Sequence, residues 1–388
     1  MKIASQRISG LVQSDIRAMT RECNRLGGIN LGQGLCELPT PEPVIAAARV
    51  ALATQEKSIY SAAEGVAPLR EAIAKKLARE NRIDADPERE IVVTNGGTGG
   101  YAATLMALFN PGDGVLLFEP YYGYHLNAAI LAGLKPQFIP FSGADLAIDE
   151  VSIRNSIDST SRAIVICTPA NPSGKMWTKS ELELVGRIAN ENNLVVITDE
   201  MYEYFRYDGR EHISPASLPE LKNRTVTLMG LSKTFSITGW RLGYVAAPAE
   251  MTEKIRLASD LFYVCAPTPL QYGVLAGFND VGADYFQNLQ TQFAAKRNQI
   301  CTTLESVGMN PIVPQGAYYV LADISRFGIK DSKQFAMKML EKVGVAGVPG
   351  RAFFSSSVGD RYIRLCFGVN DDRLTEACTR LHKLKGGL

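Results

Sequence analysis

The chain has 388 residues, of which 46% are hydrophobic, so it is long enough to form two domains with sizeable cores. Its 41 basic and 40 acidic residues give a net charge of +1, and no run of like charge stands out. This balance argues against nucleic acid or an anionic membrane as the main partner.

Seven cysteines are scattered along the chain without a C-x-x-C pair, which argues against a disulfide framework and against a zinc site. The first 25 residues lack the apolar core of a signal peptide, and no segment reaches the apolar length of a membrane span. We therefore expect a cytoplasmic protein with reduced thiols and no bound metal.

The first elements along the chain are helical. Residues 1–29 indicate a helical arm with weak patterning, and a loop with Gly32 and Gly34 follows it. Helices are predicted over residues 41–52 and 68–81, the second with apolar residues at i, i+4 and i+8.

From residue 91 the pattern becomes strand, loop and helix, repeated along the chain. The predicted strands are continuously apolar, as is typical of strands buried on both faces of a parallel sheet, and they cover residues 91–94, 115–118, 163–167, 194–198, 226–229 and 242–247. This alternation predicts an α/β fold, with a large, doubly wound, mostly parallel sheet domain over residues 41–289.

After residue 290 the regular alternation of strands and helices ends. Helices are predicted over residues 288–304 and 332–343, and a strand over residues 362–366. We expect a smaller α+β domain formed by the N-terminal arm, residues 1–40, together with residues 290–388.

Polar residues follow several of the predicted strands of the large domain. Because the carboxyl ends of parallel strands form the binding crevice of an open α/β sheet, these distant positions can converge. They are Gly97 and Thr98, Tyr122, Asn171, Asp199 and Lys233.

Lys233 lies just past a buried strand, and Arg241 follows eight residues later. A desolvated amine has a lowered pKa and becomes a nucleophile toward carbonyls, whereas an arginine fork suits a phosphate or a carboxylate. A surface lysine and a structural arginine are the alternative for this pair.

The other strand ends each allow two interpretations. The run Gly96-Gly-Thr-Gly-Gly100 can bind an anion at a helix N-terminus or can be a tight turn, and it has neither Walker nor Rossmann spacing. Asp199 is either paired structurally or meets a cationic ligand atom. Tyr202 could join the same site or pack in the core, and two prolines fix the loop of Asn171.

Ordered motifs over nearly the whole chain resemble those of the class I and II aminotransferases, which are pyridoxal phosphate (PLP) enzymes of the aspartate aminotransferase fold. The motifs are Asn171-Pro-Ser-Gly, Asp199-Glu-Met-Tyr, Ser232-Lys-Thr, Gly239-Trp-Arg-Leu-Gly-Tyr and Ile363-Arg-Leu.

The resemblance implies a role for each matched residue around the cofactor. Lys233 would form an imine with the PLP aldehyde and then move a proton between the substrate Cα and the cofactor C4′. Asp199 would pair with the pyridinium nitrogen. The remaining cofactor contacts would come from Asn171 and Tyr202 at the 3-oxygen, Tyr122 stacked on the ring, and Gly97, Thr98, Ser232 and Arg241 around the phosphate.

The resemblance also implies residues beyond the cofactor. Arg364 would bind the substrate α-carboxylate as a bidentate fork, with Gly34 and Asn171 close to the substrate. His125 would buttress Asp199. Tyr60 would reach the phosphate of the neighbouring subunit, which implies a homodimer.

Two departures from the family pattern stand out. Many relatives carry a phosphate-binding serine three residues before the lysine, where this chain has Gly230. The relatives' Gly-x-Pro-Asp is Gly34-Leu-Cys-Glu37 here, in the loop that helps to form the substrate pocket.

The main hypothesis is an aminotransferase that passes an amino group from an L-amino acid to a 2-oxo acid in a ping-pong cycle. The alternatives are a PLP-dependent lyase that performs β-elimination and a non-catalytic PLP-binding module. The donor stays open: no second arginine for a dicarboxylic substrate can be placed from the sequence. A large neutral or aromatic donor is suggested by tyrosines that could crowd the pocket, and the alternative is that they simply pack and stack; they are Tyr60, Tyr121, Tyr122, Tyr124, Tyr263 and Tyr318.

Overall fold

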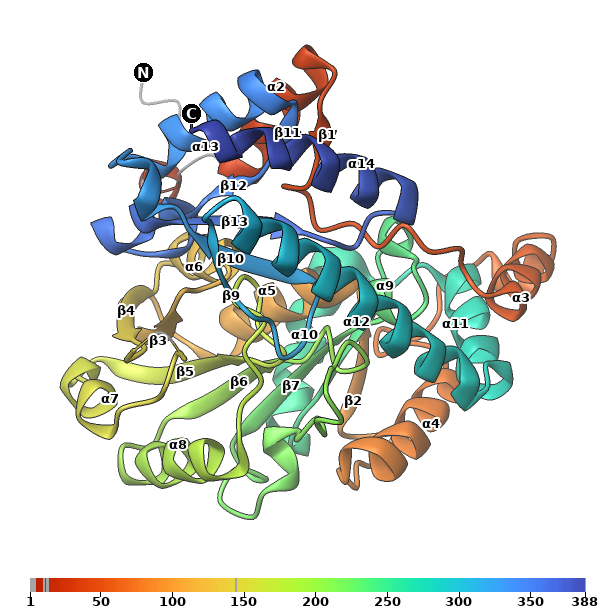
Figure 1. Ribbon diagram of the computed structural model, residues 1–388. Coiled ribbons are helices and arrows are strands. Elements are labelled where there is room, and N and C mark those ends of the chain that lie inside the picture. Colours follow the sequence, from red (N-terminus) through yellow and green to blue (C-terminus); the bar gives the residue numbers. More distant parts are fainter. Residues whose placement is uncertain (1–4, 10, 12–13, 144, 388) are drawn as a thin grey trace.

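The computed structural model describes residues 5–9, 11, 14–143 and 145–387, and the largest sheet within them has seven strands (Figure 1). Only β8 runs antiparallel to its two neighbours, and every other pairing is parallel. In spatial order the strands are β2 (Ile91–Thr94), β8 (Gly243–Ala246), β7 (Thr225–Gly230), β6 (Val195–Asp199), β5 (Ser161–Cys167), β3 (Gly114–Glu119) and β4 (Lys135–Pro140).

The apolar strands of this sheet contribute side chains to two hydrophobic cores, one on each face. Val165 and Ile197 belong to the core under helices on one face, whereas Ile164 and Val196 belong to the core on the other face. Successive side chains of a strand point to opposite faces, so a continuously apolar run requires cover on both. The helices α5 (Gly96–Leu108), α6 (Gly123–Ala132) and α10 (Ala249–Tyr263) contribute to the first core, and α7 (Glu150–Ser156) and α8 (Lys179–Glu191) contribute to the second.

A third core lies beside the β2 edge of the sheet. It contains Val44 and Val274, which come from α3 (Glu42–Leu52) and α11 (Thr268–Asp280). It also contains Leu69 and Leu77, which come from α4 (Ala67–Lys76) and the π-helical turn Leu77–Asn81 that continues it.

The predicted strands of the large sheet are confirmed, but β4 was not predicted. Its sequence, Lys-Pro-Gln-Phe-Ile-Pro, has no apolar run, and five of its six residues are partly buried or exposed at this edge of the sheet. The glycine run that follows β2 forms the first turn of α5, which begins at Gly96.

A smaller antiparallel sheet lies above the large one, with the strand order β12 (Val348–Pro349), β13 (Tyr362–Cys366), β10 (Tyr319–Asp323) and β9 (Asn310–Ile312) (Figure 1). Its hydrophobic core also contains side chains from α12 (Ala283–Ser306), α13 (Ser332–Val343) and α14 (Asp371–Leu381).

The N-terminal arm joins this smaller sheet region. The arm contains α1 (Gln6–Ser9) and α2 (Asp15–Leu26), whereas residues 1–4, 10 and 12–13 of the predicted arm lie outside the described residues. Met19 and Cys23 of α2 are buried in the same core as α13, and β1 (Ile29–Asn30) pairs in parallel with β11 (Val345–Ala346). The domain boundaries at residues 41 and 289 stay a prediction.

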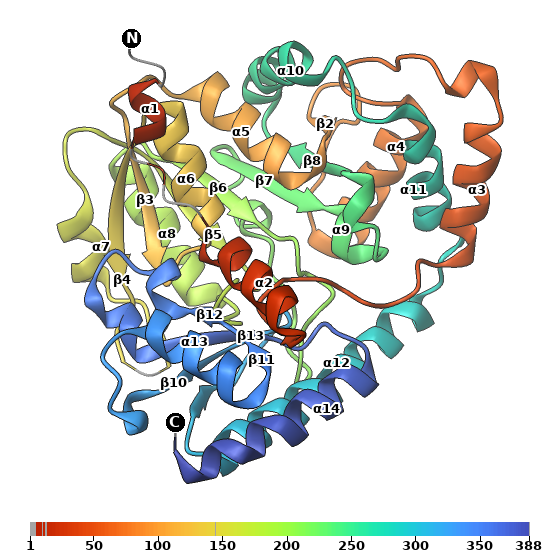
Figure 2. The same ribbon diagram turned by 90° about the horizontal axis from the view of Figure 1, so that it is seen from above.

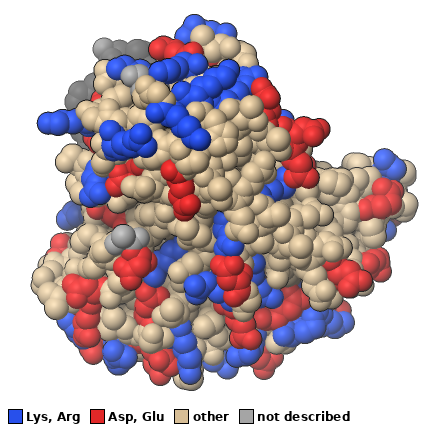
Figure 3. Space-filling model, viewed as in Figure 1, with Lys and Arg blue, Asp and Glu red and all other residues tan. Residues whose placement is uncertain are grey.

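The surface carries both signs of charge. On the face shown in Figure 3, acidic and basic side chains are interspersed, with Lys and Arg more frequent at the top of the view, over α13 and α14. Within the described part of the chain, no helix combines the length and the apolar character needed to cross a membrane. The architecture confirms the predicted α/β class with a large, mostly parallel sheet and a smaller antiparallel one.

Candidate active site

A cavity of about 970 Å³ opens at the carboxyl ends of the large-sheet strands, beneath the smaller sheet and α2. All the sequence-predicted site residues except Tyr60 line it. They are Gly34, Gly97, Thr98, Tyr122, His125, Asn171, Asp199, Tyr202, Ser232, Lys233, Arg241 and Arg364. Tyr60 is 78% exposed on the surface of the single chain.

Lys233 lies on the short helix α9 (Leu231–Thr234), which directly follows β7. Its Nζ donates a hydrogen bond to the carbonyl oxygen of Gly34 at 3.1 Å. Burial lowers the pKa of the Lys233 amine, and the positive charge of Arg241 lowers it further. A larger neutral fraction makes this amine a better nucleophile toward a carbonyl carbon.

Asp199 ends β6 and is 5% exposed. Its Oδ2 lies 2.9 Å from Nε2 of His125, which comes from α6, and its Oδ1 accepts a hydrogen bond from the backbone N–H of Met201 at 3.2 Å. Within the described chain no lysine or arginine pairs with Asp199. The carboxylate is therefore held in place by neutral donors or by His125, with capacity left for a cationic ligand atom.

The N-terminus of α5 lies beside Arg241, and together they form a corner suited to an anion. The side chain of Asn95 does not cap α5, which leaves the first-turn N–H groups of Gly97 and Thr98 available to a ligand. Gly96 has φ +68°, and a Cβ there would lie 2.6 Å from Nη2 of Arg241. Only glycine fits at this position, and it lets the guanidinium approach the helix N-terminus.

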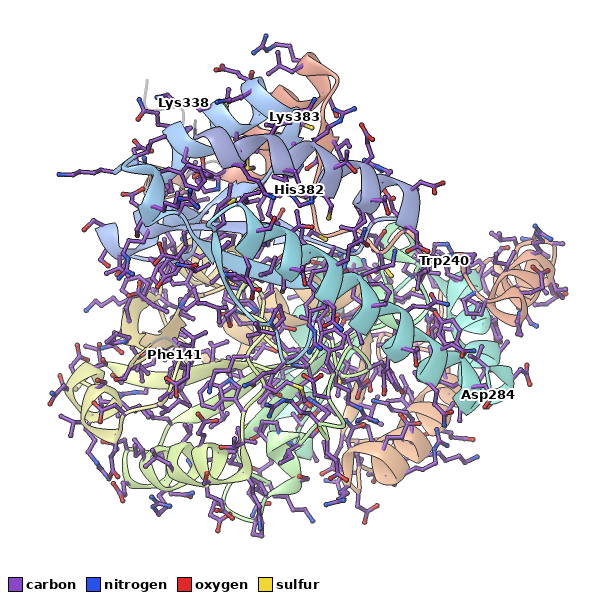
Figure 4. All side chains as sticks on the ribbon, in the orientation of Figure 1. Phe141, Trp240, Asp284, Lys338, His382 and Lys383 are labelled. Carbon is purple, nitrogen blue, oxygen red and sulfur yellow. The ribbon has the colours of Figure 1, made fainter. Side chains whose placement is uncertain are left out.

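Neighbouring residues anchor the loop that carries Arg241. Nη1 of Arg241 donates to the carbonyl oxygen of Thr238 at 3.0 Å. Trp240 packs on α11 so closely that a Cβ on Gly273 would lie 2.9 Å from its ring, and Figure 4 labels Trp240 beside this helix. The bulky indole therefore fixes the backbone directly before the arginine.

Met201 explains the glycine that replaces the relatives' serine at position 230. A Cβ on Gly230 would lie 1.9 Å from Sδ of Met201, and a Cβ on Gly97 would lie 1.6 Å from its Cε. The methionine side chain thus fills the space between β7 and the start of α5. A serine at position 230 does not fit while Met201 occupies this space.

Arg364 on β13 is 1% exposed and held from several sides. Its Nη1 donates to Oδ1 of Asn171 at 2.8 Å, and its Nη2 donates to the carbonyl oxygen of Gly32. The guanidinium lies 4.4 Å from the ring centre of Tyr319. Its Nε is buried without a partner in the described structure, so a donor remains for a ligand carboxylate.

Tyr319 is a site residue that the sequence analysis missed. Its hydroxyl lies 2.8 Å from the Tyr202 hydroxyl, and burial raises the pKa of Tyr202 well above its usual range. A Cβ on Gly34 would lie 1.9 Å from the Tyr319 hydroxyl, so this loop passes directly over it. No local signal separates Tyr319 from Tyr318, which directly precedes β10 and whose ring centre lies 5.0 Å from that of Tyr319.

Two of the six tyrosines suggested for the pocket line the cavity of the single chain. Tyr122 and Tyr124 line the cavity, with ring centres 5.3 Å apart and nearly parallel planes. Tyr121 and Tyr318 instead belong to hydrophobic cores. A large neutral or aromatic donor therefore stays a prediction.

Comparisons with known proteins agree over almost the whole chain. A model of the family described as aminotransferase class I and II matches residues 27–381. A probable N-succinyldiaminopimelate aminotransferase of Mycobacterium tuberculosis is 33% identical, with 94% of each chain covered. The aromatic-amino-acid aminotransferase 2 of Thermococcus litoralis is 34% identical over 98% of this chain and 97% of the relative.

Solved structures agree as well. The structure of N-succinyldiaminopimelate aminotransferase from Mycobacterium tuberculosis matches with a TM-score of 0.94 at 33% identity, covering 98% of this chain and 100% of that one. An aspartate aminotransferase of Thermus thermophilus, in a structure with maleate, has a TM-score of 0.92 at 30% identity and covers 99% of this chain and 100% of that one.

Enzymes of this family depend on pyridoxal phosphate, and the cavity fits that cofactor. The uncapped N-terminus of α5 and Arg241 suit its phosphate, and the desolvated Lys233 amine suits its aldehyde. Because the family model spans residues 27–381 and relatives a third identical span nearly the full length, the chain belongs to the class I and II aminotransferases and is a PLP-dependent transaminase.

Proposed function

We propose that the protein moves an amino group from an L-amino acid to a 2-oxo acid in a ping-pong cycle, with Lys233 as the residue that attaches the cofactor and carries the proton. One observation supports this most directly. The desolvated Lys233 amine shares a single cavity with the Asp199–His125 pair and with the unpaired donor of Arg364.

Each end of the cavity has residues suited to one part of the cofactor. The N–H groups of Gly97 and Thr98 and the Arg241 guanidinium would hold the phosphate, with Ser232 beside them. Tyr122 would stack on the ring, whereas Asn171 and Tyr202 would donate to its 3-oxygen. When bound, the cofactor supplies an aldehyde that condenses with amines and a protonated ring that takes up an electron pair.

Lys233 would then have two roles. It would hold the cofactor until a substrate amine takes its place, and its free amine would carry a proton between the substrate Cα and the cofactor C4′. Asp199, held by His125, would keep the ring nitrogen protonated, because a carboxylate favours a cation beside it. Arg364 would orient the substrate by its α-carboxylate.

The two alternative functions lose support. The relatives named above are all aminotransferases, so a lyase that performs β-elimination is not favoured. A non-catalytic binding module is wrong, because these relatives match the chain from end to end as enzymes.

A single-turnover experiment tests the proposed cycle. Protein loaded with PLP is given one amino acid and no acceptor, and the 2-oxo acid formed is counted. We expect one equivalent per site and continued turnover only after a 2-oxo acid is added. Continuous release of ammonia with pyruvate, without any acceptor, would contradict transamination. Borohydride reduction followed by peptide mass analysis should place the cofactor on Lys233.

We also propose a homodimer in which Tyr60 reaches the phosphate site of the neighbouring subunit. Tyr60 and Ile59 are 78% and 60% exposed, and the backbone N–H of Ser61 is tied to Oγ1 of Thr268 at 3.1 Å. Large apolar side chains on a surface commonly mark an interaction site.

Mixed dimers test this arrangement. One subunit carries Lys233→Ala and the other carries Tyr60→Ala, so one of the two sites receives an intact lysine and an intact tyrosine. We expect the mixture to be several-fold more active than either variant alone. If mixing brings no gain although mass analysis shows mixed dimers, Tyr60 does not act in the neighbouring site.

A further inference from the structure

The helix α2 presents one face to the active-site cavity. Ile16, Arg17, Thr20 and Arg21 line the cavity at helical spacing, whereas Met19 on another face is buried against the smaller-sheet core. Seen from above in Figure 2, α2 lies near the centre of the view, between the helices of the large sheet and α13. The helix thus forms a wall of the cavity and brings two arginines to it.

Neither arginine has a carboxylate partner within the described residues, in contrast to the other charges of α2. Arg25 pairs with Glu22 at 2.8 Å, and Asp15 lies 3.6 Å from Lys333. Arg17 instead donates through Nη2 to the hydroxyl of Tyr124 at 3.5 Å. Arg17 is exposed, and because the ring of Tyr124 is stacked on Tyr122, this hydrogen bond holds the guanidinium at the rim of the cavity.

The cavity offers these two cations no anion of its own. Among the described residues that line it, Asp199 is the sole carboxylate, and it faces His125 on the floor. The proposed cofactor phosphate would occupy Arg241, and the proposed α-carboxylate would occupy Arg364. Arg17 and Arg21 then remain on the cavity wall with no assigned role in cofactor binding or in the reaction.

We infer that Arg17, assisted by the charge of Arg21, binds an acidic group at the far end of the substrate side chain, so that dicarboxylic amino acids and 2-oxo acids are the substrates. The inference deepens the proposed function and rests on it, because Arg364 must hold the α-carboxylate for the side chain to reach α2. A guanidinium fork matches a carboxylate by two parallel hydrogen bonds.

Pairs of substrates that differ only in charge test the inference. Glutamate and glutamine have the same shape, and so do aspartate and asparagine, but only the acids carry the second carboxylate. Of the two acids, the one that reacts faster should be compared with its own amide. Its rate in a single-turnover half-reaction should exceed that of the amide by about tenfold or more. Arg17→Gln should remove most of this preference, because the rate with the acid falls far more than the rate with the amide.

Further variants separate binding from structure. Arg21→Gln should lower the preference by a smaller factor, and Arg17→Lys should retain part of it, since a charge remains. Arg25→Gln is the matched control on the same helix, because Arg25 pairs with Glu22, and it should leave the preference intact. An equal fall for glutamate and glutamine in Arg17→Gln would show a structural role and would overturn the inference.

Binding without turnover gives an independent measurement. Calorimetry on the PLP-loaded protein compares glutarate with its monoamide, neither of which can react. Glutarate should bind about tenfold more tightly, and Arg17→Gln should abolish that difference. If wild-type protein transaminates but treats acids and amides alike, the inference fails while the proposed function stands. If no amino acid reacts, the proposed function fails, and equal binding of glutarate and its monoamide would then overturn the inference as well.

Discussion

Arg364 and Arg17 are both arginines of the same cavity, yet they are held very differently. Arg364 is 1% exposed and fixed by Asn171, Gly32 and the ring of Tyr319. Arg17 is exposed and has one long hydrogen bond to a tyrosine hydroxyl. We call the buried or partly buried residues Lys233, Asp199, Arg364, Gly230 and Tyr319 the floor, and the exposed Arg17 and Arg21 the rim.

The difference between floor and rim indicates that the two sets of residues have different functions. Groups that are pre-oriented in a buried site can stabilise charge without reorganisation, which suits a step common to all substrates. Exposed side chains on a surface helix can be exchanged at little cost to folding, which suits the choice among substrates. Floor variants should therefore affect every amino acid alike, and rim variants should affect only some.

Replacing the floor lysine should have the largest effect. Lys233→Ala removes the proton carrier, so the single-turnover rate should fall by at least about 10²- to 10⁴-fold for every amino acid. Rapid-mixing absorbance measurements on the PLP-loaded variant give this rate. Lys179→Ala, at an exposed lysine paired with Glu183, is the control and should be unaffected. A rate within tenfold of wild type would remove Lys233 from the mechanism.

Arg364→Lys should follow in size. The ammonium keeps the charge but loses the fork and the stacking on Tyr319, so KM should rise by roughly 10- to 100-fold for acidic and neutral amino acids alike. Steady-state kinetics with glutamate and glutamine measure both factors. A rise confined to glutamate would place Arg364 at the side-chain end and would break the distinction between floor and rim.

Gly230→Ser probes the phosphate end of the floor. The new Cβ would overlap Sδ of Met201, which it would approach to 1.9 Å, so the affinity for PLP should fall by roughly tenfold. Titration of cofactor-free protein with PLP measures the dissociation constant. The double variant Gly230→Ser with Met201→Ala should recover the affinity, and if it binds as weakly as the single variant, the overlap is not the cause.

Tyr319→Phe should have a smaller effect on the floor. It removes one hydroxyl from a pair at 2.8 Å and leaves the ring beside Arg364, so kcat should fall only several-fold. The expected signature is a change in kcat with KM nearly constant. A change in KM alone would instead assign Tyr319 to the support of Arg364.

The smallest expected effect is a gain in stability. Burial lowers the pKa of Lys233 in the folded state, so at a pH between the folded and unfolded pKa values the unfolded chain binds more protons. The contribution of Lys233 to the free energy of unfolding therefore rises with pH through that interval and is least favourable below it. Lys233→Met should stabilise the cofactor-free protein at neutral pH by about 1 kcal/mol, and less at pH 10. Urea unfolding at both pH values measures the gain, and a loss at neutral pH would contradict it.

The sequence by itself determined the α/β class and the kind of chemistry. Continuous apolar runs such as Ile164–Ile166 can only be buried on both faces, and the polar residues at their ends must then meet at one edge of the sheet. The order of the motifs around Asn171, Asp199, Lys233 and Arg364 indicated the family. Each of these signals depends on residues that are close together in the sequence, so the sequence alone reveals it.

Only the tertiary structure decided what surrounds that chemistry. The edge strand β4 has no apolar run, and the arm that carries Arg17 has weak patterning, because neither is buried on two sides. Tyr319 lines the cavity because its hydroxyl meets Tyr202 and the loop at Gly34, which are distant in the sequence. The fit of Met201 against Gly230 likewise arises from contacts between separate strands and loops, which no local pattern of residues encodes.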